Sequence, residues 1–159
     1  MVFVVILTFT FTVPTFAADG ASELVDDSYS IIYLEDGSYI TTVLHVEDTT
    51  ADSMASRATT TTKKGSKTVS CKDSDGTVKW TYVLTGEFSV VQGVSATCTS
   101  ATYTQTIYDD EWSFSNGAAT KSGNVAYGVG TFKQKFLFIT IETANIDISI
   151  TCDVNGNLS

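Results

Sequence analysis

The sequence predicts an all-β protein, an antiparallel meander of about eight strands that includes an N-terminal hairpin and folds as a β-sandwich, with a barrel as the alternative. Apolar and polar residues alternate through residues 67–152, which is the pattern of strands that bury one face. Gly, Asn and Asp interrupt this alternation at short intervals, as turns do. The chain also holds only one Pro and many Thr, Val, Ile and Tyr residues, which favour strands.

Residues 1–17 form an uncharged apolar segment that ends in small residues, which is typical of a secretory signal peptide. Cleavage after Ala17 leaves Thr15 at the −3 position, whereas cleavage after Ala18 would leave the bulky Phe16 there. A membrane anchor is the alternative, but the apolar run is shorter than the ~20 residues that a spanning helix needs. We therefore expect a secreted, extracellular protein.

Residues 18–58 are expected to form an acidic leader, a β-hairpin and a linker ahead of a main β domain at residues 59–159. Tyr29–Leu34 and Tyr39–Val46 are two β-type runs that flank Glu35-Asp36-Gly37-Ser38. Asp-Gly between such runs is a strong signal for a hairpin turn. Whether this hairpin packs on the main domain stays open.

The formal charge of −9 comes from the N-terminal part of the chain. Residues 19–52 hold nine acidic residues and no Lys or Arg, whereas residues 53–159 hold nine of each sign. Nucleic-acid binding needs a basic surface that releases counterions, and only Lys63, Lys64 and Lys67 lie close together. We therefore expect no nucleic-acid partner.

The clearest strand of the main domain is Trp80–Val90, whose large apolar residues share one side. The last strand, Ile141–Cys152, likewise places its final isoleucines in phase. The remaining strands are expected at Lys67–Lys72, Val94–Tyr108, Glu111–Thr120 and Val125–Lys133.

Small residues gather on one face of the strand that begins at Val125, at Ala126, Gly128 and Gly130. Gly weakens a strand unless another group packs closely over it. We expect aromatic side chains of neighbouring strands to fill this face, and a ligand groove is the alternative. The aromatic candidates are Trp80, Trp112 and Phe114.

Three motifs lie in the main domain: Trp-Thr-Tyr-Val-Leu-Thr-Gly-Glu-Phe at Trp80–Phe88, Ser-Ala-Thr-Cys-Thr-Ser at Ser95–Ser100, and Thr-Cys-Asp-Val-Asn-Gly at Thr151–Gly156. Through them the chain from Ser66 onward resembles a group of small secreted β-proteins of unknown function from Gram-positive gut bacteria. The resemblance implies export and an all-β fold, and it implies no activity.

No pattern of catalytic, cofactor-binding or metal-ligating residues stands out. The single histidine, His45, lies on a predicted strand, and a Ser-His-acid site would need two further groups that converge on it. Asp73-Ser-Asp75-Gly76 and Asp153-Val-Asn155-Gly156 are similar to the start of a calcium loop but lack the Glu that completes one. We expect turns at both segments, no metal and no cofactor.

We expect a non-enzymatic module that binds an extracellular protein or glycan or contributes to the cell surface, with no transmembrane anchor after cleavage. A small secreted hydrolase and a purely structural secreted protein are the alternatives. A hydrolase would need paired carboxylates at a defined distance. The candidates for such a pair are Glu87, Asp109, Asp110 and Glu111.

The three cysteines predict one disulfide, because export places them where such a bond persists. Two-residue turns on either side of the Trp80 strand set Cys71 opposite Trp80 and Cys98 opposite Glu87. These levels lie ~23 Å apart along the strand, beyond the ~7 Å limit between bridged Cα atoms. Because the strands alternate in direction, the start of the Val94 strand and the end of the last strand share one end of the molecule, and Cys71 lies at the other. We therefore predict a bond between Cys98 and Cys152, with Cys71 a free, buried thiol.

The apolar run Phe136-Leu-Phe-Ile139 has two possible places in this fold. We expect the run to begin the last strand inside the core, because Phe and Leu are more often buried than exposed. The alternative is that it forms an exposed tip of the hairpin. An exposed apolar patch on a secreted protein marks an interaction site. The candidates for such a partner contact are Phe136, Leu137, Phe138 and Ile139.

Overall fold

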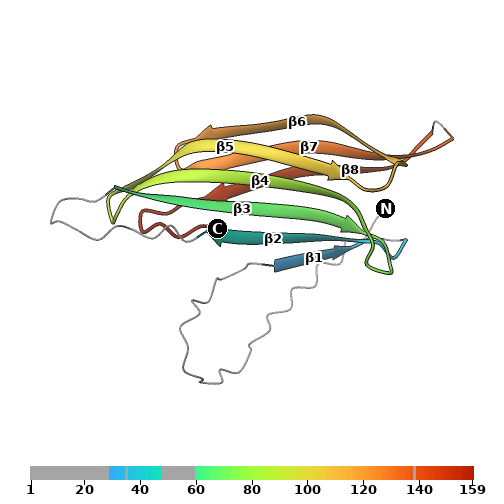
Figure 1. The fold of residues 1–159 in the computed structure, drawn as a ribbon, viewed down its shortest axis with the longest axis horizontal. Helices are drawn as coiled ribbons and strands as arrows, with labels where there is room; N and C mark the ends of the chain where they lie inside the picture. The colour runs from blue at the N-terminus through green and yellow to red at the C-terminus, as the bar shows by residue number, and fades with distance from the viewer. Residues whose placement is uncertain (1–28, 35, 48–59, 138) are drawn as a thin grey trace, which may run out of the picture.

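The computed structural model describes residues 29–34, 36–47, 60–137 and 139–159. The predicted signal peptide, the acidic leader, most of the linker and Phe138 lie outside these residues. The described residues form eight strands, which are labelled in Figure 1. Their bounds are β1 Tyr29–Tyr33, β2 Tyr39–Glu47, β3 Thr60–Lys72, β4 Val78–Val91, β5 Ser95–Ile107, β6 Trp112–Ser122, β7 Val125–Phe136 and β8 Ile139–Thr151.

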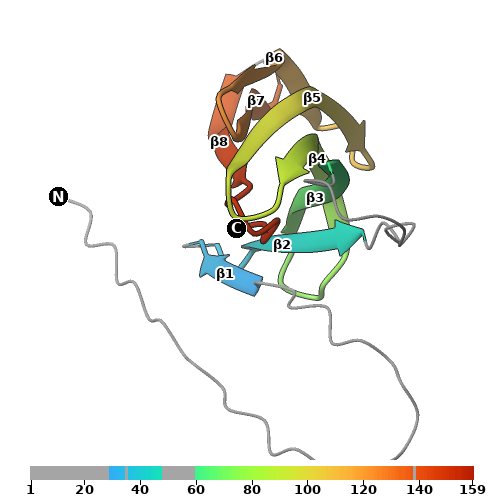
Figure 2. The same ribbon diagram turned by 90° about the vertical axis from the view of Figure 1, so that its left-hand side faces the viewer.

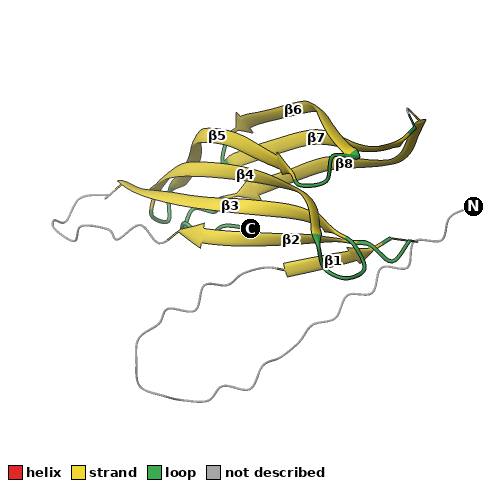
Figure 3. Cartoon of the chain, turned by 45° about the vertical axis from the view of Figure 1, so that its right-hand side comes forward, coloured by secondary structure: helices red, strands yellow, loops and turns green. Residues whose placement is uncertain are grey.

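The strands form two antiparallel sheets, one in the order β1-β2-β3-β4-β5 and the other in the order β6-β7-β8. Each strand pairs with the next one along the chain, except that the chain passes from the first sheet to the second between β5 and β6 (Figure 2). Figure 3 shows strands and connecting loops without a helix in the described part of the chain. The prediction of an all-β antiparallel sandwich is therefore confirmed.

The N-terminal hairpin belongs to the larger sheet. β1 and β2 pair from Tyr29 opposite Val43 to Tyr33 opposite Tyr39, so the Asp-Gly segment turns the chain as predicted. β2 then pairs with β3 along its whole length, through Glu47 opposite Lys64. The hairpin is thus continuous with the main domain.

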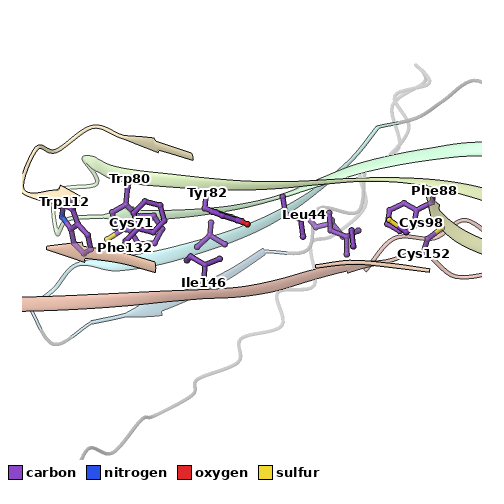
Figure 4. Close-up of a cluster of buried hydrophobic side chains, with 14 of the residues drawn as sticks. Leu44, Cys71, Trp80, Tyr82, Phe88, Cys98, Trp112, Phe132, Ile146 and Cys152 are labelled. Carbon is purple, nitrogen blue, oxygen red and sulfur yellow. The ribbon is translucent and has the colours of Figure 1, made fainter. Parts of the chain in front are cut away.

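The core lies between the sheets and is organised around β4, on which buried residues alternate with half-buried ones over the whole strand. At one end of the core the Trp80 ring stacks on Phe132 of β7, with ring centroids 3.9 Å apart and planes 8° apart. Trp112 of β6 packs against Trp80 at 5.9 Å (Figure 4). These rings bring the three-stranded sheet over β4.

The small-residue face of β7 receives aromatic rings, as the core interpretation predicted. A Cβ atom added to Gly128 would lie 2.8 Å from the Tyr82 hydroxyl oxygen, and one added to Gly130 would lie 2.6 Å from the Phe114 ring. The Tyr82 hydroxyl lies 3.2 Å from the carbonyl oxygens of both Ala118 and Val129. Tyr82 was not among the rings expected there, and it fills the place by reaching across the sandwich from β4.

The C-terminal residues fold back on the end of β8. Cys152 forms a bridge with Leu158, and the Thr151 and Ser159 backbones exchange hydrogen bonds of 2.9 and 3.0 Å. A Cβ atom at Gly65 of β3 would lie 2.5 Å from the Leu158 side chain, so the missing side chain there admits Leu158. This C-terminal hairpin joins the end of the smaller sheet to β3.

Replacing Gly130 with Ala is expected to lower the free energy of unfolding by about 1–3 kcal/mol, because the new methyl group would overlap the packed Phe114 ring. Chemical denaturation monitored by tryptophan fluorescence measures the loss. Val129→Ala, at a partly exposed residue on the opposite face of β7, is the matched control and is expected to cost less. Equal stability of Gly130→Ala and the wild type would contradict the proposed close packing.

Candidate functional site

The most unusual surface of the molecule is β1, the end strand of the larger sheet. All five of its residues are exposed, and they are apolar except for Ser30. The exposed fraction is 58% at Ile32 and 73% at Tyr33, two neighbours whose side chains point to opposite faces. β1 lies beyond the smaller sheet at the outer edge of the sandwich (Figures 1 and 2). It therefore offers apolar side chains on both faces and a backbone edge to which no described strand is paired.

A shallow pocket of about 170 Å³ lies beside β1 and is lined by Tyr29, Ser30, Thr42 and Lys67. Lys67 stands in the inward-facing series of β3 with the buried Val69 and Cys71, and burial lowers the pKa of its ammonium group. Its Nζ donates a 2.7 Å hydrogen bond to the carbonyl oxygen of Ser149 on β8. The pocket thus combines hydroxyl groups with a cation, which is a setting for a small hydrogen-bond acceptor.

The tip of the β7–β8 hairpin is the second exposed apolar surface. Leu137 lies in the turn and is 75% exposed, and Ile139 at the start of β8 is 67% exposed. The expectation that this run lies in the core is wrong for both residues, because the hairpin extends past the body of the sandwich (Figure 1). A partner contact at this tip stays a prediction.

Replacing Leu137 with Asn is expected to leave the free energy of unfolding unchanged or to raise it by up to about 1 kcal/mol. Leu137 has a φ of 47°, a left-handed conformation that Asn adopts more readily than Leu, and its side chain makes little core contact. Urea unfolding measures the difference. A fall of several kcal/mol in the free energy of unfolding would show that Leu137 belongs to the core. Phe132→Ala, at a fully buried residue, is the control that shows how large a fall a core substitution causes.

Glu87 lies far from the other carboxylates that would serve a hydrolase. Asp109, at the β5–β6 connection, lies 3.1 Å from Lys79, which also contacts Asp73 at 3.1 Å. Burial tends to raise the pKa of Asp109, but the Glu111 backbone N–H and the Lys79 ammonium outweigh it and lower the pKa. Glu87 is eight residues from Lys79 along β4, or ~26 Å. Glu87 and the Asp109 segment therefore form no catalytic pair.

The two segments similar to calcium loops are turns, as predicted. Asp73 accepts backbone hydrogen bonds from Asp75 and Thr77, and Asp153 accepts them from Asn155 and Asn157. These bonds occupy the carboxylates locally. Among the described residues, no three His, Cys, Asp or Glu side chains gather into a metal-binding group. His45 lies on β2 and is exposed, as expected of a strand residue.

The three cysteines are buried and in the thiol form. Cys71 lies opposite Trp80, as predicted. Cys98 lies opposite Phe88 and not Glu87, because the turn after β4 has three residues and not two. Figure 4 shows Cys98 and Cys152 beside Phe88 at one end of the core and Cys71 at the other. The bond between Cys98 and Cys152 stays a prediction.

One pair of carboxylates had no signal in the sequence. Glu142 is half-buried on β8 and stands in the inward-facing series with Ile146, where sequence alternation would place an apolar residue. Burial, together with the negative charge of Asp36 in the β1–β2 turn, raises the pKa of Glu142. Asp36 itself accepts hydrogen bonds from the Ser38 hydroxyl and backbone N–H, which lower its own pKa. The β1–β2 turn and the start of β8 are thus close in space.

The raised pKa of Glu142 predicts that the contribution of this residue to stability falls as the pH rises. The folded state holds the proton more tightly than the unfolded state, so stability is lost from about pH 4.5 upward, through the raised pKa of the folded state. Glu142→Gln should remove this part of the pH dependence and gain up to about 1 kcal/mol at pH 7, because solvent screens a half-exposed group. Thermal melts from pH 4 to pH 8 test this, with the exposed Asp147→Asn as control. A parallel loss of stability with pH in Glu142→Gln and the wild type would refute it.

Comparisons of the chain with protein-family models, with curated proteins and with solved structures find no match. The resemblance to small secreted bacterial β-proteins therefore stays a prediction. Within the described residues there is no helix of the length and apolarity needed to cross a membrane.

Proposed function

We propose that this chain is a secreted, non-enzymatic binding module that takes its partner through the free edge of β1. The observation that carries the proposal is the exposure of an uncharged, apolar strand at the end of a sheet. Natural proteins usually protect such edges with Lys, Pro or a bulge, because an open edge pairs readily with another strand. Addition of a partner strand uses the backbone for affinity and the alternating side chains for specificity. The signal peptide predicted at residues 1–17 supports an extracellular partner.

The occupant that fits this edge is an extended segment of another extracellular protein, with apolar residues at its centre and Lys or Arg at its ends. In the sequence, Asp26 and Asp27 precede β1, and Glu35 and Asp36 follow it. A second copy paired antiparallel about Ile31 would set Asp27 opposite Glu35 and Asp26 opposite Asp36. Like charges directly opposite each other destabilise a pair of strands. Basic flanks on a different partner turn the same four positions into favourable contacts.

The pocket beside β1 adds a preference for one side chain of the partner. A residue that pairs with Ser30 would point to the same face as Ser30, toward Thr42 and Lys67. Because Lys67 and the hydroxyl groups can donate hydrogen bonds, we expect an acceptor such as Asn, Gln, Asp or Glu there. The preferred segment thus has a central acceptor, apolar neighbours and basic ends.

Selection from a library of random displayed peptides against the full chain without its predicted signal peptide tests this proposal. We expect enrichment of segments with alternating apolar residues and basic ends, and their binding should weaken as ionic strength rises. Ile32→Lys should weaken binding of an enriched peptide at least ~10-fold, which corresponds to ~1.4 kcal/mol. Val94→Lys, at a comparably exposed apolar residue in the β4–β5 turn, should leave binding unchanged.

Three results would contradict the proposal. Binding that Ile32→Lys and Val94→Lys affect equally would place the contact elsewhere. Binding on a glycan array, without any peptide enrichment, would replace the protein partner with a carbohydrate. Concentration-dependent dimers in light scattering that Ile32→Lys abolishes would make a second copy the occupant.

A further inference from the structure

Cys98 and Cys152 are brought together by one turn. The backbone N–H of Cys98 donates to the carbonyl oxygen of Gly123 at 2.8 Å, and that of Cys152 donates to the carbonyl oxygen of Asn124 at 3.0 Å. Gly123 and Asn124 are consecutive residues of the β6–β7 turn, so their Cα atoms lie only ~3.8 Å apart. The Asn124 side chain also donates to the Cys152 carbonyl oxygen at 2.6 Å. The two cysteines, which belong to different sheets, are therefore held against the same short segment.

Only weak hydrogen bonds hold the two thiol groups in their present orientations. Both side chains are buried beside Phe88 (Figure 4). The Cys98 sulfur contacts the Ser100 carbonyl oxygen at 3.2 Å, and the Cys152 sulfur contacts the Asp153 carbonyl oxygen at 3.5 Å. Thiols are weak donors, so a rotation about χ1 gives up little hydrogen bonding. Burial raises the pKa of Cys152, and the negative charges of Asp153 and of an ionised Cys98 raise it further.

We propose that Cys98 and Cys152 form a disulfide that fastens the C-terminal hairpin and the end of β8 to β5. The bond would join the two sheets at the end of the core opposite to the Trp80 and Phe132 stack. It would also hold Cys152 in the bridge to Leu158, whose side chain packs over Gly65 of β3. One covalent bond thus links β5 to the end of β8 and, through Leu158, to β3.

The bond forms by two exchange steps with a small disulfide such as oxidised glutathione. The thiolate of one cysteine attacks the glutathione disulfide, forms a mixed disulfide and releases one glutathione thiolate. The thiolate of the second cysteine then attacks the protein sulfur of the mixed disulfide and releases the second glutathione. The two protein thiols lose two protons and two electrons, and the glutathione disulfide is reduced to two thiols.

Burial determines the stage of folding at which this exchange takes place, and position in the core determines which cysteine is left out. It raises the pKa of Cys98 and Cys152, so few thiolates are present in the closed sandwich. The reaction therefore belongs to the stage before the C-terminal hairpin has closed over the core. Cys71, whose pKa burial raises to about 12, lies at the far end and stays reduced.

Refolding of the full chain in a glutathione redox buffer, followed by non-reducing peptide mapping, tests the proposal. We expect a peptide that joins Cys98 to Cys152 and an alkylated Cys71. The loop of about fifty residues closed by the bond predicts a melting temperature higher by roughly 10 °C than in the presence of a reductant. Cys71→Ala should keep this difference, and Cys152→Ala should abolish it.

A bond that includes Cys71, or alkylation of all three cysteines after refolding under oxidising conditions, would overturn the proposal. The mapping of the unsubstituted chain decides this even if Cys152→Ala does not fold. The measurement needs neither a partner nor the β1 edge. A failure here is therefore distinct from a failure of the proposed binding function.

Discussion

The packing of aromatic rings over Gly128 and Gly130 is the constraint on which the rest of the structure depends. Two sheets that pack face to face are usually about 10 Å apart, with side chains from both filling the space. At these two positions β7 contributes no side-chain volume, and Tyr82 and Phe114 occupy the room that it leaves. The Tyr82 hydroxyl lies near two carbonyl oxygens of the opposite sheet, so the contact is polar as well as apolar. It fixes β7 over β4, and the positions of β6 and β8 follow.

The exposed edge at β1 is a consequence of that placement. Three strands centred over β4 cover part of a five-stranded sheet, and β1 is the strand farthest from them in the sheet order. The hydrogen bond from Lys67 to Ser149 joins β3 to β8, and the negative charge of Asp36 in the β1–β2 turn acts on Glu142 of β8. The arrangement of the sheets thus leaves the apolar residues of β1 exposed to solvent. Their composition is typical of a strand that is buried in a protein core or an interface.

The strands and their buried faces could be predicted because a period of two is visible in any single strand. Hence the hairpin before Tyr39, the inward series of β4 and the pairing of Cys71 with Trp80 were all predictable. The pairing of Cys98 was wrong by one residue because a Gly at φ 69° makes the turn after β4 three residues long. Neither the place of Tyr82 over Gly128 nor the burial of Glu142 could be predicted, since each depends on which strands face each other across the sandwich. The free edge of β1 depends in the same way on the width of the opposite sheet.

The C-terminal hairpin affects the order in which the parts of the sandwich can fold. Strand pairs within each sheet join neighbours in the sequence, whereas contacts between the sheets join residues far apart in the chain, and such non-local contacts slow folding. The contact between Leu158 and Gly65 is one of these non-local contacts, and it joins the hairpin after β8 to β3. During synthesis the larger sheet, which consists of β1 to β5, can form before Leu158 is available to pack over Gly65. The packing of Leu158 over Gly65 is therefore a non-local step that needs β3 and β8 to be in place first, and until it occurs the sandwich stays open at β3.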